Sequence, residues 1–289
     1  MTDLHFLAFD GGGSGCRAML CRPDGTVLSR VNGGGANLTS DFDAARRNII
    51  ETITTAYHAA GMDVTAMTAG VAVLGVAGAE VGDAAARLQA KLDFATSRVV
   101  SDQDITIAGI LGQNDGTLAQ IGTGSFFVCQ FSGSTRRAGG RGLVLGDECG
   151  GAWLGRELLR ATIRSCDGLG DSSPLTTDIL AGFDDDPHNI VLFARDASAT
   201  AFATYAPRLF AAAEAGDVIA GGIVTHAVRE LEHVLTAVEA GATPPLFLCG
   251  GVGERFIPLV GKVFHDRIVH PSGDGLSGAL LMARALHDA

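Results

Sequence analysis

The sequence predicts an α/β protein built from two related domains. Its 289 residues suit two domains of roughly 100–200 residues each. An apolar strand runs into a glycine-rich loop and a second strand twice, with loops that begin at Gly11 and Gly122. Strands followed by segments of helical spacing are typical of α/β domains. We therefore expect domains at residues 1–110 and 111–289 with a cleft between them, and a terminal helix that can pack back on the first domain.

The first half reads as a hairpin-rich sheet followed by alternating helices and strands. Turn residues at Pro23-Asp24-Gly25 separate two short apolar runs, which indicates antiparallel strands. Asp41 is a candidate N-cap of the first helix and Gly61 a stop signal at its end. The predicted strands are residues 4–9, 18–21, 26–30, 69–76 and 97–100, and the predicted helices are residues 41–60, 81–92 and 105–111.

The second half repeats the strand–loop–strand opening and then becomes mainly helical. The glycine-rich segment at residues 139–151 leads into the first of several segments with helical spacing. The predicted strands are residues 118–121, 126–131 and 246–249, and the predicted helices are residues 152–165, 190–196, 199–215, 217–240 and 276–287.

Composition excludes several classes of function. The net charge of −11 argues against nucleic acid as the main partner, because phosphate backbones attract basic surfaces. The N-terminus lacks the features of a signal peptide, and the longest uncharged run, residues 64–79, is shorter than the ~20 residues of a membrane span. None of the six cysteines has CxxC spacing, so neither a disulfide framework nor a zinc site is expected. We expect a cytoplasmic protein with reduced thiols.

Two glycine loops are candidates for holding phosphate. In Asp10–Gly15, glycines allow several backbone N–H groups to approach phosphate oxygens, and Ser14 adds a hydroxyl. Asp10 can hold Mg²⁺ through water, since this ion prefers oxygen ligands and keeps several waters. Ile121–Ser125 repeats the arrangement at the start of the second domain. The alternative for each loop is a flexible hairpin, and the Walker A pattern is absent.

Two other strand ends are candidates for nucleoside binding and catalysis. Cys249–Glu254 is an apolar strand ending in two glycines, which a base or ribose can approach, or an ordinary strand–helix turn. Asp102 follows a predicted buried strand, where open α/β sheets bind ligands, and can act as a general base. The alternative is a helix N-cap, and Asp104 is the competing carboxylate.

Three polar loops are candidates for contacting a hydroxylated substrate. Residues 139–151 carry many glycines with Asp147 and Glu148, either of which can bind two adjacent hydroxyls or cap the following helix. Asn37 follows three glycines. Gly75–Gly78 follows a buried strand and can bring backbone close to a substrate.

Seven segments occur together in one order over nearly the whole chain. In this order the chain resembles the BadF/BadG/BcrA/BcrD-type branch of the actin/hexokinase/Hsp70 ATPase superfamily, and within it bacterial glucosamine and N-acetylglucosamine kinases. The segments are LAFDGGGSGCRAML, GGGAN, VLGVAGAE, VVSDQD, IGTGSF, AGGRG with GDECGGAWLG, and LCGGVGE.

The resemblance implies two ribonuclease-H-like domains around an ATP cleft and transfer of phosphate from ATP, with Mg²⁺, to the C6 hydroxyl of an amino sugar. It also implies a homodimer as one possible state. The implied catalytic base is Asp102. The implied ATP-binding residues are Asp10 (also Mg²⁺, through water), Gly12, Gly13, Ser14, Gly122, Thr123, Gly124, Gly250 and Gly251. The implied sugar-binding residues are Asn37, Gly78, Asp102, Ser125, Gly140, Arg141, Gly142 and Asp147.

Three rival functions stay open at the level of sequence. The first is an ATP-dependent activator of a radical 2-hydroxyacyl-CoA dehydratase, for which Cys149 would be the nearest iron–sulfur ligand. The second is a nucleotide-binding regulator without catalysis. The third is a kinase of another hexose or of anhydro-N-acetylmuramic acid. The choice between glucosamine and N-acetylglucosamine is also open.

Overall fold

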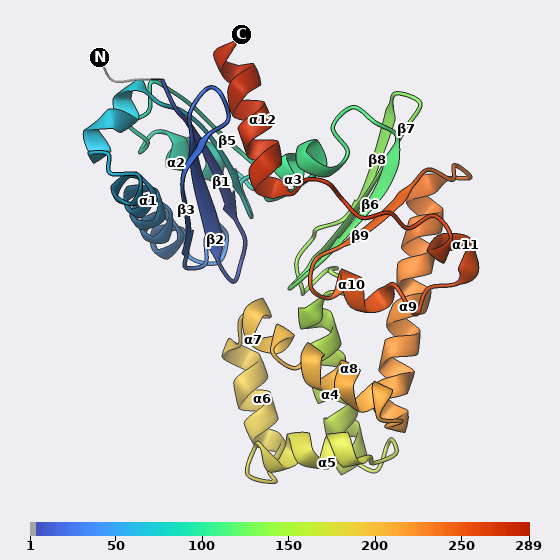
Figure 1. Cartoon of the computed structure of the whole chain (residues 1–289). Coiled ribbons are helices and arrows are strands. Elements are labelled where there is room, and N and C mark those ends of the chain that lie inside the picture. The colour runs from blue at the N-terminus through green and yellow to red at the C-terminus, as the bar shows by residue number, and fades with distance from the viewer. Residues whose placement is uncertain (1–3) are drawn as a thin grey trace. The chain divides into compact units, whose positions relative to one another are not determined.

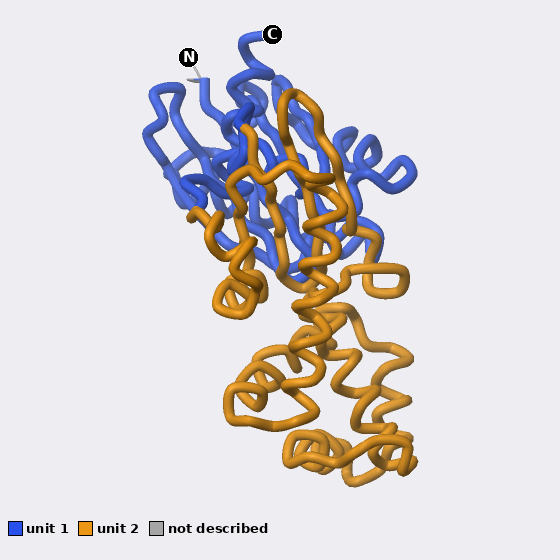
Figure 2. Tube along the Cα trace, turned by 90° about the vertical axis from the view of Figure 1, so that its right-hand side faces the viewer, with its two compact units in different colours: residues 1–114, 271–289 blue, residues 115–270 orange. Residues whose placement is uncertain are grey.

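The computed structural model describes residues 4–289, which form two compact units (Figure 2). Unit 1 contains the described residues up to Asn114 together with residues 271–289, and unit 2 contains residues 115–270. Unit 2 is therefore inserted between the two segments of unit 1, and α12 (Gly275–His287), the last helix described, belongs to unit 1.

Unit 1 is built on a five-stranded sheet of order β3-β2-β1-β4-β5 (Figure 1). The first three strands form antiparallel hairpins, while β4 is parallel to β1 and β5 is parallel to β4. The carboxyl ends of β1, β4 and β5 therefore lie at one edge of the sheet. The strands are β1 (Phe6–Gly11), β2 (Cys16–Cys21), β3 (Val27–Gly33), β4 (Val71–Val76) and β5 (Thr96–Val100).

Helices cover both faces of this sheet. The period-two alternation of β1 directs Leu7 to the face covered by α1, where it packs with Ile53, and directs Phe6 to the face covered by α3 and α12. Asp41 caps α1 as predicted, since its Oδ1 accepts the Ala44 N–H at 2.9 Å. The helices are α1 (Phe42–Ala59), α2 (Ala84–Gln89), α3 (Asp102–Ile110) and α12 (Gly275–His287), with a 3₁₀ helix at Val64–Ala69.

The backbones of α3 and α12 are in direct contact. A side-chain carbon at Gly278 would clash with the carbonyl oxygen of Ile105, and one at Gly109 would clash with that of Asp274. Glycine on both helices is therefore required for this approach. The contact fixes the position of α3, whose first residue is Asp102.

Unit 2 repeats the same plan in a four-stranded sheet of order β8-β7-β6-β9. β6, β7 and β8 are antiparallel, and β9 is parallel to β6. β8 was not predicted, because its exposed sequence STRRAG lacks the alternation of a half-buried strand. The strands are β6 (Gly116–Ile121), β7 (Ser125–Phe131), β8 (Ser134–Gly139) and β9 (Leu246–Cys249).

The helices of unit 2 share one apolar core with its sheet. The single helix predicted at 199–215 is two helices, because Pro207 sits in the first turn of α8 and begins a new helix there. The short helices α5, α10 and α11 were not predicted. The helices are α4 (Gly151–Cys166), α5 (Pro174–Ala181), α6 (Pro187–Asp196), α7 (Ala199–Ala203), α8 (Ala206–Glu214), α9 (Val218–Glu239), α10 (Gly253–Phe256) and α11 (Lys262–His265).

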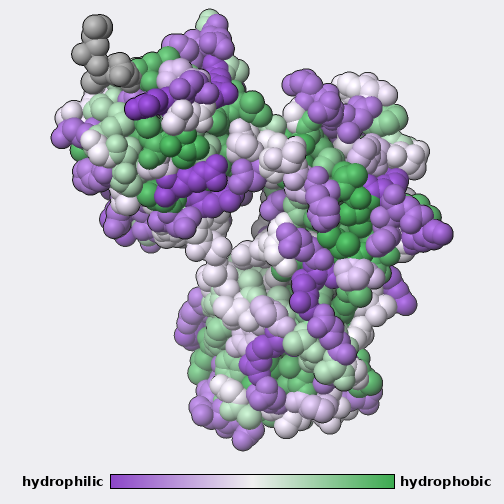
Figure 3. Space-filling view, in the orientation of Figure 1, coloured by the Kyte–Doolittle hydropathy of each residue, from purple (hydrophilic) through white to green (hydrophobic). Residues whose placement is uncertain are grey.

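The surface of each unit is mixed in polarity. Figure 3 shows hydrophilic side chains spread over the visible face of both units, between smaller apolar patches. Within residues 4–289, no helix combines the length and the hydropathy that a membrane crossing requires.

We expect Gly278→Ala to destabilise unit 1, because the added methyl group would force α3 and α12 apart. Overpacking of this kind costs about 1–3 kcal/mol. The control is Gly222→Ala in α9, where an added carbon meets no atom within 4 Å, so a gain of about 0.5–1 kcal/mol is expected from helix propensity. Thermal unfolding followed by circular dichroism compares the two variants. An unchanged melting temperature for Gly278→Ala would contradict the described contact.

Candidate active site

Three loops of unit 1 are joined at the edge where β1 and β4 end. They are the loop after β1 that was predicted to hold phosphate, the loop after β3 that carries Asn37, and the loop after β4 that carries Gly78. Backbone hydrogen bonds connect them: Ala36 N–H to Gly12 O (2.9 Å), Leu38 N–H to Ala77 O (2.9 Å), and Ala77 N–H to Gly11 O (2.8 Å). Residues 12–14, 37 and 78, separated widely in sequence, thus belong to one local structure.

Asn37 and Gly78 are neighbours in this structure. Asn37 Oδ1 accepts hydrogen bonds from the Thr39 N–H (2.9 Å) and the Thr39 hydroxyl (2.7 Å), which orients the amide. A carbon added at Gly78 would lie 3.1 Å from Asn37 Oδ1, and its φ of +79° is a conformation that favours glycine. These contacts fix the orientation of the Asn37 side-chain amide.

Asp102 is the first residue of α3 and is separated from the end of β5 by Ser101 alone. The predicted alternative of an N-cap role for Asp102 is wrong, because Ser101 is the N-cap and its Oγ accepts the Asp104 N–H at 3.1 Å. Asp102 Oδ1 accepts the N–H of the adjacent Gln103 at 3.0 Å. Removal from water, with smaller contributions from the charges of Glu80 and Asp10, raises the pKa of Asp102 to about 7. A carboxyl group with such a pKa exchanges protons readily near neutral pH.

The carboxylate of Asp10 forms an ion pair with Arg17, a residue that was not predicted from the sequence to belong to the site. Arg17 donates to Asp10 Oδ2 at 2.5 Å and to Asp274 Oδ2 at 3.1 Å, and Asp274 is the N-cap of α12. Asp10 and Arg17 are directly opposite across the β1–β2 hairpin. An aspartate and an arginine at opposite positions of a hairpin indicate an ion pair. Recognising this pair from the sequence would have required the register of β1 and β2, which the sequence alone does not give.

In unit 2, the N-terminus of α4 packs on the second glycine loop. The Gly151 N–H donates to Gly122 O (2.8 Å), and the Ala152 N–H donates to Thr123 O (2.9 Å). These bonds engage the loop carbonyls, while Gly122 donates its own N–H to Gly124 O at 2.9 Å. The Thr123 hydroxyl and the remaining N–H groups of the loop are the groups that a phosphate could accept from.

Four of the predicted sugar-binding residues of unit 2 are brought together beside this loop. Asp147 is buried against Gly124, and its Oδ1 accepts the Gly142 N–H at 3.1 Å. The Ser125 hydroxyl donates to the carbonyl of Glu148 at 2.6 Å, and the Gly140 N–H donates to Ser125 O at 2.7 Å. Burial raises the pKa of Asp147 above its usual value, although hydrogen bonds from backbone N–H groups oppose this shift.

The alternative of helix capping by Asp147 or Glu148 is wrong. Gly150 is the N-cap of α4, and no side chain caps this helix. Arg141, the remaining predicted sugar-binding residue of this loop, is exposed and close in sequence to the exposed Val144 and Leu145. The side chain of Arg141 is therefore on the surface of this loop and does not belong to the buried cluster around Asp147.

A pocket with a volume of about 550 Å³ lies beside the end of β9. Gly250 has a φ of +86°, and a side chain there would clash with the carbonyl of Ile121, so the turn requires glycine. Gly251 lines the pocket, as do Gly122 and Thr123 of the phosphate loop. The alternative of a strand–helix turn also holds, because α10 begins at Gly253.

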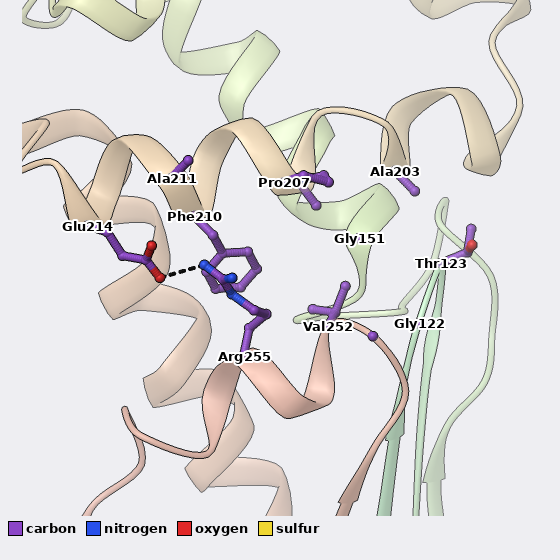
Figure 4. A pocket seen from close by; sticks show the side chains of 12 residues that line it. Gly122, Thr123, Gly151, Ala203, Pro207, Phe210, Ala211, Glu214, Val252 and Arg255 are labelled. Atoms are coloured by element: carbon purple, nitrogen blue, oxygen red, sulfur yellow. Dashed lines mark hydrogen bonds and ion pairs between the residues drawn. The ribbon is translucent and has the colours of Figure 1, made fainter.

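The opposite wall of this pocket comes from α8, which sequence reasoning did not include. Figure 4 shows the Phe210 side chain of α8 directed toward Arg255, and Pro207 and Ala211 of α8 also line the pocket. Glu214 and Arg255 form an ion pair of 2.5 Å in the same pocket. Nothing in the local sequence of α8 distinguishes a pocket wall from an ordinary amphipathic helix.

The environment of Cys149 disfavours a role as a cluster ligand. Its thiol is buried and donates to the carbonyl of Ala227 at 3.1 Å. Burial raises the pKa of this thiol far above its ordinary value. A thiol that is buried and bonded to a backbone carbonyl is not presented at the surface, so this position does not support the iron–sulfur activator considered from the sequence.

Comparison with known proteins gives one family match and several relatives. The sequence model of the BadF/BadG/BcrA/BcrD ATPase family matches residues 9–283. The chain is 27% identical to the glucosamine kinase GspK of Vibrio cholerae over 283 residues, which covers 96% of this chain and 95% of that protein. It is 28% identical to an N-acetylmuramic acid/N-acetylglucosamine kinase of Clostridium acetobutylicum over 61% of this chain and 59% of that protein.

The fold also matches a crystal structure over its whole length. A candidate N-acetylglucosamine kinase of Chromobacterium violaceum superimposes with a TM-score of 0.90 and 30% identity, covering 98% of this chain and 100% of that one. This match confirms the predicted fold class of two α/β domains of the actin-like ATPase type.

We expect Asp102→Asn to stabilise the protein above pH 7. The pKa of Asp102 is about 7 in the folded protein, against 3.8 as its ordinary value. Between these values the folded protein holds a proton that the unfolded chain has lost, so the free energy of unfolding decreases as the pH rises. Asparagine does not titrate, so the variant does not lose this part of the free energy of unfolding as the pH rises.

Thermal unfolding at about pH 5 and about pH 8 tests the expectation, since the difference between the variant and the wild type should grow with pH across this window. Asp104→Asn removes an equal charge from the same helical turn and serves as the control. A variant that is less stable than the wild type at both pH values would contradict the assigned environment of Asp102.

Proposed function

The chain belongs to the BadF/BadG/BcrA/BcrD ATPase family, and we propose that it is an ATP-dependent kinase whose acceptor is glucosamine or N-acetylglucosamine. The observation that carries the proposal is the carboxyl group of Asp102, whose pKa is about 7, at the sheet edge where the loops of Gly12, Asn37 and Gly78 are joined. A general base is most effective when its pKa is near the working pH. The amino-sugar kinases among the relatives support the choice of acceptor.

Unit 2 carries the groups suited to ATP. The pocket beside α8 has an apolar wall for a nucleoside, and Thr123 at its other end offers a hydroxyl donor to the phosphates. Backbone N–H groups and a hydroxyl can hold phosphate without a basic surface, which agrees with the net charge of −11. Because ATP is the donor, we assign the reaction to the cytoplasm.

The proposed reaction is an in-line transfer of the γ-phosphoryl group. The C6 hydroxyl of the sugar attacks phosphorus as the bond to the ADP oxygen breaks, and Asp102 accepts the hydroxyl proton. The products are the sugar 6-phosphate and ADP. Positioning and charge stabilisation supply most of the catalysis in such transfers. The buried carboxylate of Asp147 and the amide of Asn37 are the groups proposed to hold sugar hydroxyls.

Mg²⁺ is the expected partner of the nucleotide phosphates. Asp10 offers a carboxylate at the end of β1, although Arg17 engages its Oδ2. Among residues 4–289, no group of three or more His, Cys, Asp or Glu side chains is arranged to hold a metal ion. One carboxylate fits Mg²⁺ that is bound mainly by phosphates and keeps its waters. When bound, the ion would neutralise phosphate charge, and Asp10 would hold it through water.

A coupled assay of ADP release tests the proposed function directly. The purified protein is supplied with ATP, Mg²⁺ and one acceptor at a time from glucosamine, N-acetylglucosamine, glucose and anhydro-N-acetylmuramic acid. We expect turnover with at least one amino sugar and a kcat/KM at least about tenfold lower with glucose, because glucose lacks the C2 nitrogen that distinguishes the amino sugars. ADP release that does not depend on any sugar would contradict the proposal.

We expect Asp102→Asn to reduce kcat by about 10²–10⁴ with little change in the KM for the sugar, since general-base catalysis contributes this amount. In the wild type, kcat/KM should decrease as the pH falls below about 7, where Asp102 becomes protonated. Asp104→Asn is the matched control and should keep both the rate and the pH profile. If Asp102→Asn kept wild-type turnover, the base would have to be another carboxylate, with Asp104 and Asp147 as the candidates.

A further inference from the structure

The pocket of unit 2 has two chemically different ends. One end is formed by Gly122 and Thr123 of the phosphate loop, and the other by Glu214 and Arg255 (Figure 4). Between them, the lining side chains of α8 are apolar. If the phosphates of a nucleotide lie at the glycine loop, its base lies toward the Glu214–Arg255 end.

Arg255 is held in a defined orientation at that end. Its Nη2 group lies 2.5 Å from Glu214 Oε1, and its guanidinium carbon lies 5.2 Å from the centre of the Phe210 ring. The two contacts come from one helix, α8, and meet Arg255 from α10. A planar guanidinium group fixed in this way is a surface on which a base can stack.

The ion pair also leaves hydrogen-bonding groups of both kinds. Arg255 uses one nitrogen for Glu214, so its other N–H groups can donate, and Glu214 Oε2 can accept. Among the described lining residues, Thr123, Glu214 and Arg255 have the only polar side chains, and Thr123 belongs to the phosphate end. Hydrogen bonding of these lining side chains to the edge of a base therefore depends on Glu214 and Arg255.

On their Watson–Crick edges, adenine and guanine each present a donor beside an acceptor, but in opposite order: N6–H and N1 in adenine, O6 and N1–H in guanine. A pocket with one fixed donor would select one of them. Stacking on the guanidinium plane of Arg255 does not depend on this order, so it does not distinguish the two purines. Pyrimidines are smaller, so they lose stacking area and reach less far from the ribose toward the pair.

We propose that Arg255, oriented by Glu214 and Phe210, is the base-recognition residue of the nucleotide pocket and that it accepts adenine and guanine nucleotides with similar affinity. This inference rests on the proposed function, because it takes the pocket to be the nucleotide site. It extends the proposed function in two ways. The phosphoryl donor can be any purine nucleoside triphosphate, and Arg255 is the residue that determines this choice.

Isothermal titration calorimetry of the full chain with ADP, GDP, CDP and inorganic tripolyphosphate, all in the presence of Mg²⁺, tests the proposal. For the wild type, we expect dissociation constants for ADP and GDP within about fivefold of one another, and a value for CDP about tenfold weaker, because stacking is the main sequence-tolerant contribution to base binding.

The decisive variant is Arg255→Met, which keeps side-chain length and removes the guanidinium group. We expect it to weaken ADP and GDP about tenfold, as loss of a stacked and hydrogen-bonded cation predicts, and to leave tripolyphosphate binding unchanged. Arg208→Met is the matched control, since Arg208 lies on α8, pairs with Asp178, and is 45% exposed against 44% for Arg255. It should bind all four probes as the wild type does.

Two results would overturn the inference while leaving the kinase proposal intact. One is ADP binding more than about 50-fold tighter than GDP binding, which would require a selective hydrogen bond that the pair does not explain. The other is equal behaviour of Arg255→Met and Arg208→Met. A protein that binds none of the nucleotides and still folds would instead contradict the proposed function itself.

Discussion

Parallel pairing of one late strand with the first strand of a hairpin sets the position of the candidate site in each unit. In unit 1 this pairing joins β4 to β1, and in unit 2 it joins β9 to β6. The carboxyl ends of the paired strands then meet at one edge, where the chain leaves each strand in a glycine-rich loop. Loops 65 residues or more apart in sequence become neighbours through backbone hydrogen bonds alone, such as that from Ala77 to Gly11.

The environment of Asp102 affects both the stability of the fold and the basicity of its carboxylate. Its position at the start of α3 follows from the contact of α3 with α12, where Gly109 and Gly278 allow the two backbones to meet. Its carboxyl group is removed from water and lies near the charges of Glu80 and Asp10. A carboxylate in this environment destabilises the folded protein at neutral pH, and it is also more basic than one in water.

Much of this arrangement could be predicted from the sequence, and the exceptions have physical causes. The strands with apolar runs, the cap at Asp41 and the family were predicted and confirmed, because each depends on local pattern or on motif order. The edge strand β8 and the break before Pro207 were missed because exposed strands lack alternation and a single helical period spans the break. Arg17, Phe210 and Glu214 were missed because their importance arises only when distant segments meet.

The return of the chain to unit 1 has a consequence for synthesis. Unit 2 is one continuous segment, residues 115–270, whereas unit 1 needs α12 from the last residues to cover the face that contains Phe6 and Ile105. Domains generally fold as units while the chain emerges from the ribosome. Unit 2 can therefore complete its core before α12 has been made, and until then α3 is, among the described helices, the one that packs on the face of the unit 1 sheet containing Phe6.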